Sequence, residues 1–275
     1  MLKRILSSII GFPLLAALVV LGGWPLKIAV LGLIVIAMYE LYTALSKKHM
    51  SIHCVGYLFA AIYMYFIDSA NFANVMTIVL IAFILTISTL LVLFHRRITV
   101  MDCAATMFGF FYTTVLMSLI YLVRMSNGGL YNVWIIFIAA WGCDTGAYFT
   151  GITLGKHKLI PSLSPNKTVE GAVGGVVFAM LLSIAYGAIM VNTSNVNAAN
   201  DMQTIGLLIR YAVIGAGGAV FAQLGDLAAS AIKRYTNIKD FGKLIPGHGG
   251  VMDRFDSVLF TAPAVYLISL LIIHR

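Results

Sequence analysis

The chain has 275 residues, of which 61% are hydrophobic and only 10% are charged, and its formal net charge at pH 7 is +8. A soluble domain carries about 25% charged residues, so this composition excludes an ordinary soluble protein and predicts an all-α integral membrane protein. The basic residues stand in short clusters between apolar runs. This spacing is typical of membrane-protein loops and argues against a nucleic-acid partner.

Nine apolar runs approach the roughly 20 residues that a membrane-spanning helix needs. In chain order they cover about 5–23, 25–46, 52–70, 72–94, 101–123, 130–150, 169–191, 203–229 and 251–273. No linker divides them, so we expect one polytopic domain over residues 1–275. Within it we expect the helices of residues 1–100 to serve packing or dimerisation. Residues 101–275, with loops at 151–168 and 230–250, should carry the functional site.

The positive charges predict how these helices are oriented. If Lys3 and Arg4 are cytoplasmic, nine helices place 14 of the 18 Lys and Arg residues in cytoplasmic segments. The other four are Lys27, Arg124, Arg210 and Arg275. Cytoplasmic loops carry such an excess of basic residues. The sequence therefore predicts about nine transmembrane helices, a cytoplasmic N-terminus and a multi-pass protein of the cytoplasmic membrane.

Asp226 and Glu40 are two of the acidic residues that lie within apolar runs. Asp226 would share a helix face with Ser230 and Lys233, with Arg234 beside it. An ionised carboxylate in the membrane is costly unless it pairs with a cation or binds a metal. A structural Asp226–Lys233 pair and a metal ligand are both open interpretations. Glu40, in the second run, is expected to pair within the helix bundle.

A polar stretch near the C-terminus, residues 230–257, concentrates charge in this apolar chain. It holds eight of the chain's charged residues: Lys233, Arg234, Lys239, Lys243, Arg254, Asp240, Asp253 and Asp256. The two last acids begin a helix, where simple capping would explain them. The preceding glycines favour a binding site, because they let backbone approach a ligand and offer N–H groups to anions. Three acids that converge there, Asp226 included, would suit Mg²⁺ together with phosphate.

A second polar patch runs from Trp141 to Gly171. Asp144 is expected to be buried in its helix, on the same face as Tyr148, and the following loop offers Lys156 and Lys167. An ordinary basic cytoplasmic loop would explain this pattern as well. Two more acids, Asp68 and Asp102, are expected to be solvated at helix ends.

The polar stretch closely resembles the signature of the phosphatidate cytidylyltransferase family. Thirteen positions fall in register: Ser230, Lys233, Arg234, Lys239, Asp240, Gly242, Pro246, His248, Gly249, Gly250, Asp253, Arg254 and Asp256. The upstream segments DTGAYFTG, GKHKL and SPNKTVEG resemble the second block of this family. The sequence departs from that block at Ile152-Thr153, where many members carry a basic residue.

The resemblance implies an all-helical homodimer with a polar cavity open to the cytoplasm and the membrane. It would convert CTP and phosphatidic acid into CDP-diacylglycerol and diphosphate, with Mg²⁺ and with K⁺ as a further candidate cation. Asp226, Asp253 and Lys233 would be catalytic, and Asp226, Asp253 and Asp256 would bind the metal. The implied substrate-binding residues are Ser230, Arg234, Lys239, Asp240, His248, Gly249, Gly250, Arg254, Asp144, Lys156 and Lys167.

A cation-coupled membrane transporter is the alternative function. Such transporters also use intramembrane acidic and basic residues at broken helices, near the bilayer midplane and between inverted repeats. This sequence shows no internal repeat, and its charges gather on one predicted side of the membrane. The pattern therefore favours the enzyme.

Overall fold

The computed structural model describes residues 2–46, 52–192, 201–244 and 249–273. The chain folds into two compact units. The N-terminal unit comprises residues 1–121 and 235–254, and the C-terminal unit comprises residues 122–234 and 255–275. The C-terminal polar stretch therefore contributes to both units.

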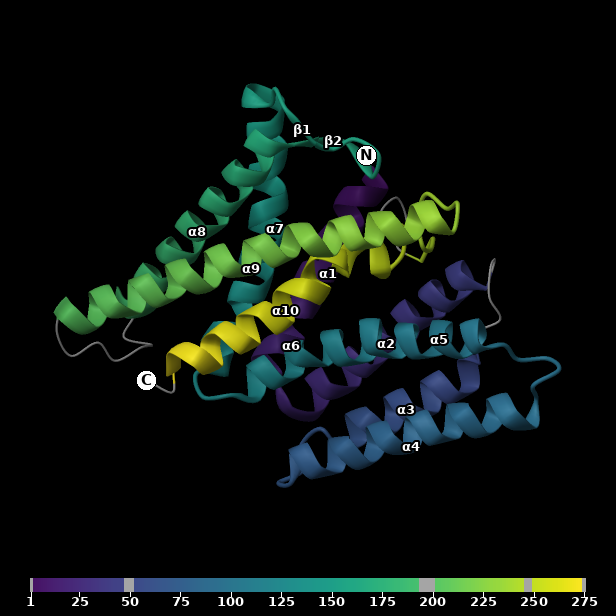
Figure 1. Ribbon diagram of the computed structural model, residues 1–275. Helices are drawn as coiled ribbons and strands as arrows, with labels where there is room; N and C mark the ends of the chain where they lie inside the picture. The colour runs from purple at the N-terminus through teal and green to yellow at the C-terminus, as the bar shows by residue number, and fades with distance from the viewer. Residues whose placement is uncertain (1, 47–51, 193–200, 245–248, 274–275) are drawn as a thin grey trace. The chain divides into compact units, whose positions relative to one another are not determined.

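The N-terminal unit consists of helices, most of them drawn in purple and blue in Figure 1. Its helices are α1 (Leu2–Leu21), α2 (Gly23–Leu45), α3 (His53–Phe66), α4 (Phe72–Leu93), α5 (Val100–Gly109), the π-helical segment η1 (Phe110–Val115) and the start of α6 (Leu116–Met125). The fully buried ring of Tyr42 stacks on His53, with ring centroids 5.0 Å apart. Its hydroxyl donates a hydrogen bond to the carbonyl oxygen of Thr106 at 2.8 Å. Tyr42 thereby joins α2, α3 and α5.

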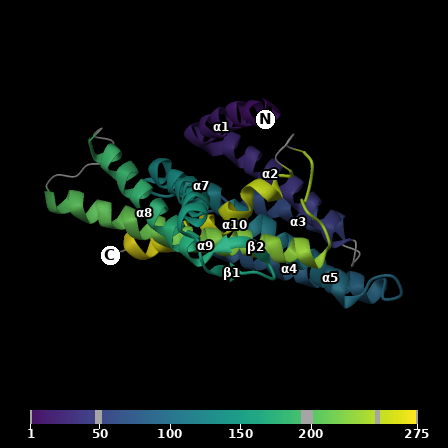
Figure 2. The same cartoon turned by 90° about the horizontal axis from the view of Figure 1, so that it is seen from above.

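The C-terminal unit contains α7 (Gly129–Leu154), α8 (Val169–Asn192), α9 (Asp201–Tyr235) and most of α10 (Met252–Ile273). Figures 1 and 2 show α7 and α8 side by side, joined at one end by the strands β1 (Lys158–Ile160) and β2 (Ser164–Thr168). The strands are antiparallel, with Lys158 opposite Thr168. Close packing needs small residues here, because a Cβ on Gly175 would lie 2.8 Å from the carbonyl oxygen of Cys143.

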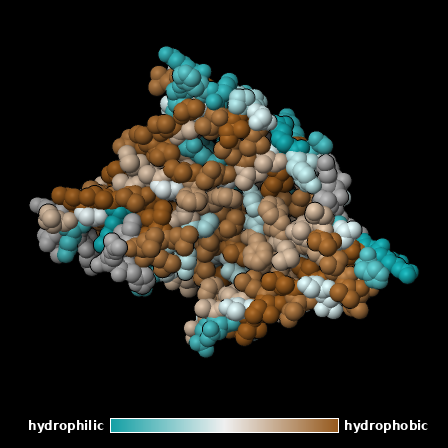
Figure 3. All heavy atoms as spheres, viewed as in Figure 1, coloured by the Kyte–Doolittle hydropathy of each residue, from teal (hydrophilic) through white to brown (hydrophobic). Residues whose placement is uncertain are grey.

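Seven helices in the described part of the chain are long and apolar enough to cross a membrane. They are Gly23–Leu45, Phe72–Leu93, Val100–Met125, Gly129–Leu154, Val169–Val191, Met202–Tyr235 and Met252–Leu271. Two further apolar helices, Gly11–Leu21 and His53–Phe66, are shorter. Brown, hydrophobic atoms cover much of the helical surface in Figure 3, and hydrophilic atoms gather at the β1–β2 hairpin. A multi-pass membrane protein is therefore confirmed, whereas the count of nine spans and the cytoplasmic N-terminus stay predictions.

The helix α3 is shorter than its apolar run because the run ends in a charged turn. The ammonium group of Lys27 lies 2.5 Å from Asp68 Oδ2, and the hydroxyl of Tyr121 donates to Asp68 Oδ1 at 2.7 Å. Fourteen helical residues reach only about 21 Å, less than the ~30 Å hydrocarbon core. Asp68 is exposed beside the end of α3, as expected, and it also binds Lys27 and Tyr121.

Asp102 differs from the sequence-based expectation. It is 6% exposed and forms a capping box with Thr99 at the start of α5. The amide of Thr99 donates to Asp102 Oδ2 at 2.8 Å, and the amide of Asp102 donates to Thr99 Oγ1 at 3.3 Å. The two side chains of the capping box thus each satisfy one helix-end N–H group that would otherwise lack a partner.

Candidate active site

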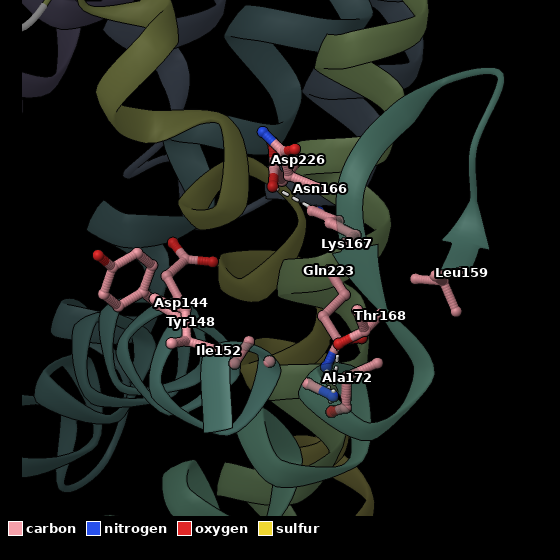
Figure 4. A pocket seen from close by; sticks show the side chains of 13 residues that line it. Asp144, Tyr148, Ile152, Leu159, Asn166, Lys167, Thr168, Ala172, Gln223 and Asp226 are labelled. Atoms are coloured by element: carbon pink, nitrogen blue, oxygen red, sulfur yellow. Dashed lines mark hydrogen bonds and ion pairs between the residues drawn. The ribbon is translucent and has the colours of Figure 1, made fainter. Parts of the chain in front are cut away.

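A pocket of about 520 Å³ lies within the C-terminal unit, between α7, the hairpin, α8 and α9 (Figure 4). Its polar lining includes Asp144, Asn166 and Lys167 of the second polar patch and the intramembrane acid Asp226. Apolar residues such as Ile152, Leu159 and Ala172 complete the walls. The pocket thus combines charge with an apolar lining, as a site for a charged group in a membrane protein requires.

An ion pair between Lys167 and Asp226 crosses this pocket. Figure 4 shows Lys167 reaching from β2 to the carboxylate of Asp226 on α9. Both side chains are about a quarter exposed, at 26% and 29%. The sequence suggested Lys233, on the same helix, as a partner of Asp226. The structure shows a partner from the hairpin, so the pair joins the second polar patch to the helix that leads into the C-terminal polar stretch.

A group of carboxylates lies around Ser257 in the C-terminal unit. The hydroxyl of Ser257 donates to Asp144 Oδ2 at 3.0 Å and lies 3.4 Å from Asp256 Oδ1. Asp256 also interacts electrostatically with Asp226, Asp144 and Lys233. The structure therefore brings together three predicted site acids and connects two of them through Ser257, a residue that sequence reasoning missed. In the sequence, only its position directly after Asp256 could have indicated Ser257 as a site residue.

Asp144 is exposed, which contradicts the expectation that it is buried within its helix. It lines the pocket from α7, together with Tyr148 one turn later (Figure 4). The helix α7 continues to Leu154, four residues beyond its predicted end. The pocket beside this longer helix gives the carboxylate an open surface.

Gln223 is a second residue that sequence reasoning missed. It lies one turn before Asp226 on α9 and lines the same pocket. Its Nε2 atom donates to the carbonyl oxygen of Ala172 at 2.8 Å and lies 3.3 Å from the sulfur of Cys143. The side chain thereby ties α9 to α8 and α7. The sequence could have indicated Gln223, because its polar side chain lies three residues before the intramembrane acid Asp226.

The hairpin is held by Glu170 at the start of α8. Its carboxylate accepts hydrogen bonds from the backbone amides of Lys156 at 3.0 Å and His157 at 3.2 Å. The Nδ1 atom of His157 lies 2.6 Å from Glu170 Oε1. Lys156, a predicted substrate-binding residue, keeps an exposed side chain. Its backbone is therefore fixed while its ammonium group faces solvent.

In the N-terminal unit, carboxylates surround the backbone that leads into α10. Asp253 Oδ2 accepts hydrogen bonds from the amides of Phe241 at 2.8 Å and Gly250 at 3.0 Å. The carboxylate of Glu40, on α2, accepts from the amides of Val251 at 3.0 Å and Met252 at 2.8 Å. Both acids thus act as caps for backbone N–H groups.

These bonds correct the interpretation of the glycines before α10. The N–H of Gly250 was expected to be free for an anion, but it donates to Asp253. Gly249 has a φ of 85°, a left-handed conformation that favours glycine. A Cβ there would also lie 2.9 Å from Asp253 Oδ2. The two glycines therefore serve the turn and the carboxylates around it.

The remaining predicted residues are divided between the units. Ser230, Lys233 and Arg234 lie in the last turns of α9, in the C-terminal unit. Lys239, Asp240 and Arg254 are exposed residues of the N-terminal unit. His248 lies outside the described residues. Asp226 and Asp256 thus belong to one unit and Asp253 to the other.

The acids do not form a ready metal cluster. In the described ranges 2–46, 52–192, 201–244 and 249–273, no group of three or more His, Cys, Asp or Glu residues could hold a metal ion as the side chains lie. The cation that Asp226 contacts is the ammonium group of Lys167.

The fold and the pocket define a multi-pass helical membrane protein with a charged site within its apolar helices. Comparison with known proteins gives its family. The chain belongs to the cytidylyltransferase family, whose model matches residues 2–272.

Curated relatives cover almost the whole chain. A protein named phosphatidate cytidylyltransferase from Bacillus subtilis (strain 168) is 34% identical over 276 residues, which is 98% of this chain and 97% of the relative. Proteins of the same name from Staphylococcus haemolyticus and Staphylococcus saprophyticus are 33% and 34% identical. Each of these matches covers 96% of this chain and 97% of the relative. The family suggested by the sequence signature is thus confirmed.

Proposed function

We propose that this protein transfers the cytidylyl group of CTP to phosphatidic acid, forming CDP-diacylglycerol and diphosphate for phospholipid synthesis. Membership of the cytidylyltransferase family and the name shared by its relatives support this reaction. The structural observation that carries the proposal is the Lys167–Asp226 pair, which joins the patch 141–171 to the intramembrane acid just before the stretch 230–257, across one pocket.

The reaction makes one bond and breaks one. A phosphate oxygen of phosphatidic acid attacks the α-phosphorus of CTP and forms a new P–O bond. The bond from the α-phosphorus to the oxygen that bridges to the β-phosphorus breaks, and diphosphate leaves with the electron pair. Because the attacking oxygen is already anionic, the enzyme needs no strong base. Its main tasks are to bring two anions together and to stabilise the charge of the leaving group.

The basic side chains would carry these tasks. Lys167 is part-exposed in the pocket, and Lys233 interacts electrostatically with Asp256. Both can therefore bind phosphate oxygens without leaving the neighbourhood of the acids. Ser230, Lys156, Arg234, Lys239 and Arg254 are proposed to bind the triphosphate or the lipid phosphate, as the family signature implies.

Mg²⁺ is part of the proposal, with K⁺ as a further candidate cation. The donor chemistry fits Mg²⁺, because Asp226 and Asp256 offer carboxylate oxygens and Asp226 already contacts a cation, the Lys167 ammonium group. When bound by these two residues, the metal would neutralise phosphate charge. Asp253 lies in the other unit, and its share in the metal site stays a prediction.

We also propose that the site opens to the cytoplasmic side of the cell membrane and that the protein acts as a homodimer. The excess of basic residues in alternate loops supports this orientation, and the family resemblance suggests the dimer. Labelling of a cysteine placed at exposed Lys158 in intact cells and in inverted vesicles would test the orientation. The mass of the protein in detergent would test the dimer.

The decisive experiment is an assay of the purified protein with labelled CTP and phosphatidic acid in mixed micelles. We expect label in a lipid product that requires both phosphatidic acid and Mg²⁺. A cation flux in proteoliposomes without lipid labelling would instead support the transporter. Labelling without added Mg²⁺, in the presence of a chelator, would contradict the metal part alone.

A further inference from the structure

Glu40 contacts the signature segment from a distant part of the sequence. It lies on α2, 211 residues before Val251 and 212 before Met252, the two residues whose amides it binds. Each carboxylate oxygen accepts one N–H, Oε1 from Val251 at 3.0 Å and Oε2 from Met252 at 2.8 Å. All of these atoms belong to the N-terminal unit. Glu40 therefore connects an N-terminal helix to the start of α10.

The burial of Glu40 requires a structural or functional reason. The residue is only 4% exposed, and a buried carboxylate is unfavourable unless its oxygens have hydrogen-bond partners. The start of a helix supplies such partners, because its first N–H groups are unsatisfied and its dipole favours negative charge. Glu40 thus occupies the place at the start of α10 that an external anion could otherwise take.

Two glycines of the segment are shaped around the Glu40 carboxylate. A Cβ on Gly242 would lie 2.2 Å from Glu40 Oε1, and a Cβ on Gly250 would lie 2.3 Å from the same atom. Neither glycine has a positive φ, so steric space is the reason for glycine at both positions. The requirement for small residues at 242 and 250 therefore follows from Glu40.

The bonds of Glu40 adjoin those of Asp253. Asp253 receives the amides of Phe241 and Gly250, and Glu40 receives the next two amides along the chain. Three consecutive N–H groups, at residues 250–252, are thus held by two carboxylates from different elements. The orientation of Asp253 therefore depends on a backbone that Glu40 fixes.

We propose that Glu40 is a positioning residue for the cytidylyl-transfer reaction: it holds the backbone of residues 250–252 and so sets the direction of Asp253 and Arg254. The inference rests on the proposed role of these two residues in metal and phosphate binding. Glu40 itself touches neither substrate nor metal and acts through the segment that it holds.

The direct test is Glu40→Gln, which keeps the size of the side chain but turns one oxygen into an N–H₂ group. That group cannot accept the amide of Val251 or Met252, so one bond is lost and two donors face each other. We expect faster amide hydrogen exchange at residues 250–252. We also expect a roughly 10- to 100-fold lower kcat per folded protein, since small misplacements of reacting groups have effects of this size. The Mg²⁺ concentration for half-maximal activity should rise several-fold.

Asp68→Asn is the matched control in the same unit. It weakens the Lys27–Asp68 pair and should lower stability without touching the start of α10. We expect it to leave kcat per folded protein and the Mg²⁺ dependence unchanged. If Glu40→Gln fails to fold, Gly242→Ala is the second variant, because its Cβ would overlap the Glu40 carboxylate and displace it. We expect it to give smaller increases in amide hydrogen exchange at residues 250–252 and in the Mg²⁺ concentration for half-maximal activity.

A double variant tests whether Glu40 acts through Asp253. If it does, adding Glu40→Gln to Asp253→Asn should lower the residual activity by less than about 2-fold, because the two changes affect one unit of structure. Unchanged exchange at residues 250–252 in Glu40→Gln would overturn the inference. Fully additive activity losses in the double variant would also overturn it. The same holds if Asp68→Asn, at the same stability as Glu40→Gln, loses as much activity. A wild-type protein without cytidylyl transfer would refute the proposed function, while the exchange data would still decide whether Glu40 holds the segment.

Discussion

The two units hold their acidic residues in different ways. In the C-terminal unit, Asp226 contacts a flexible Lys167 side chain at the wall of an open pocket. In the N-terminal unit, Glu40 accepts backbone N–H groups at the start of α10, and Asp253 accepts those of Gly250 and Phe241. A side-chain ion pair can exchange partners when a ligand arrives, because lysine turns about several bonds. The acids in the N-terminal unit are held by fixed backbone donors, and turning either carboxylate away would leave buried N–H groups without an acceptor.

This difference assigns different tasks to the acids. Asp226 and Lys167 are suited to bind a metal ion and a phosphate, because each can give up the other for a ligand of the same charge. Glu40 is suited to fix geometry, because both its oxygens are committed to backbone. Asp253 combines the two tasks, since its Oδ2 atom anchors the segment and the same carboxylate is predicted to bind metal.

The largest effect is expected from Asp226→Asn, which removes the charge of the exchangeable acid at constant size. We predict a loss of roughly 100- to 1000-fold in kcat, the range found when one electrostatic group of an active site is removed. Labelled-CTP incorporation, measured on protein with an unchanged melting temperature, is the test. Near-normal activity in that folded variant would exclude Asp226 from the metal site.

Asp253→Asn and Asp253→Ala together separate the two tasks of Asp253. The asparagine keeps an oxygen for the amides of Phe241 and Gly250, so we expect an activity loss of about 100-fold from the lost charge with little loss of stability. The alanine leaves both N–H groups without that acceptor and should also destabilise the protein by about 1–3 kcal/mol. Thermal unfolding and activity, measured for both variants, separate the metal-binding task of Asp253 from its anchoring task. Equal stability of the two variants would contradict the anchoring role.

Lys167→Met tests the exchangeable partner of Asp226. It removes one cation from the pocket, and we expect roughly a 10-fold higher KM for a substrate phosphate, consistent with the ~1.5–3 kcal/mol of a hydrogen bond to a charged group. The matched control is Lys158→Met, at an exposed position of the same hairpin. Steady-state kinetics with varied CTP and varied phosphatidic acid would show which substrate is affected. An equal effect of both variants would indicate general loop charge instead of a specific contact.

The smallest effects are expected from a pair of glycine substitutions in the N-terminal unit. Gly242→Ala should destabilise the protein by about 1–3 kcal/mol, since its Cβ would overlap the Glu40 carboxylate. Gly32→Ala, within α2, meets nothing within 4 Å and should stabilise it by about 0.5–1 kcal/mol. Melting temperatures of both variants in one detergent give the comparison. Equal shifts would show that the space beside Glu40 is not restrictive.

Much of the fold could be predicted from the sequence because helix length and apolarity are local properties. Each of the nine apolar runs coincides with a helix or, at 101–123, with the consecutive segments α5, η1 and α6. The departures arise where side chains act across the chain. The helix in the run at 52–70 ends at Phe66, and the turn after it carries Asp68, which binds Lys27 on α2. The loop at 151–168 contains a hairpin, whose backbone Glu170 holds from the start of α8.

By itself, the sequence determined the membrane class, the positions of the helices and the family, because apolar length and fixed motif spacing are written along the chain. It also named Asp226, Lys167 and Asp256 as site residues. Only the tertiary structure decided that Lys167 is a partner of Asp226, that Ser257 and Gln223 join the site, and that Glu40 holds the start of α10. The reason is physical: a hydrogen bond between residues 211 positions apart depends on how helices pack, and local sequence carries no record of it.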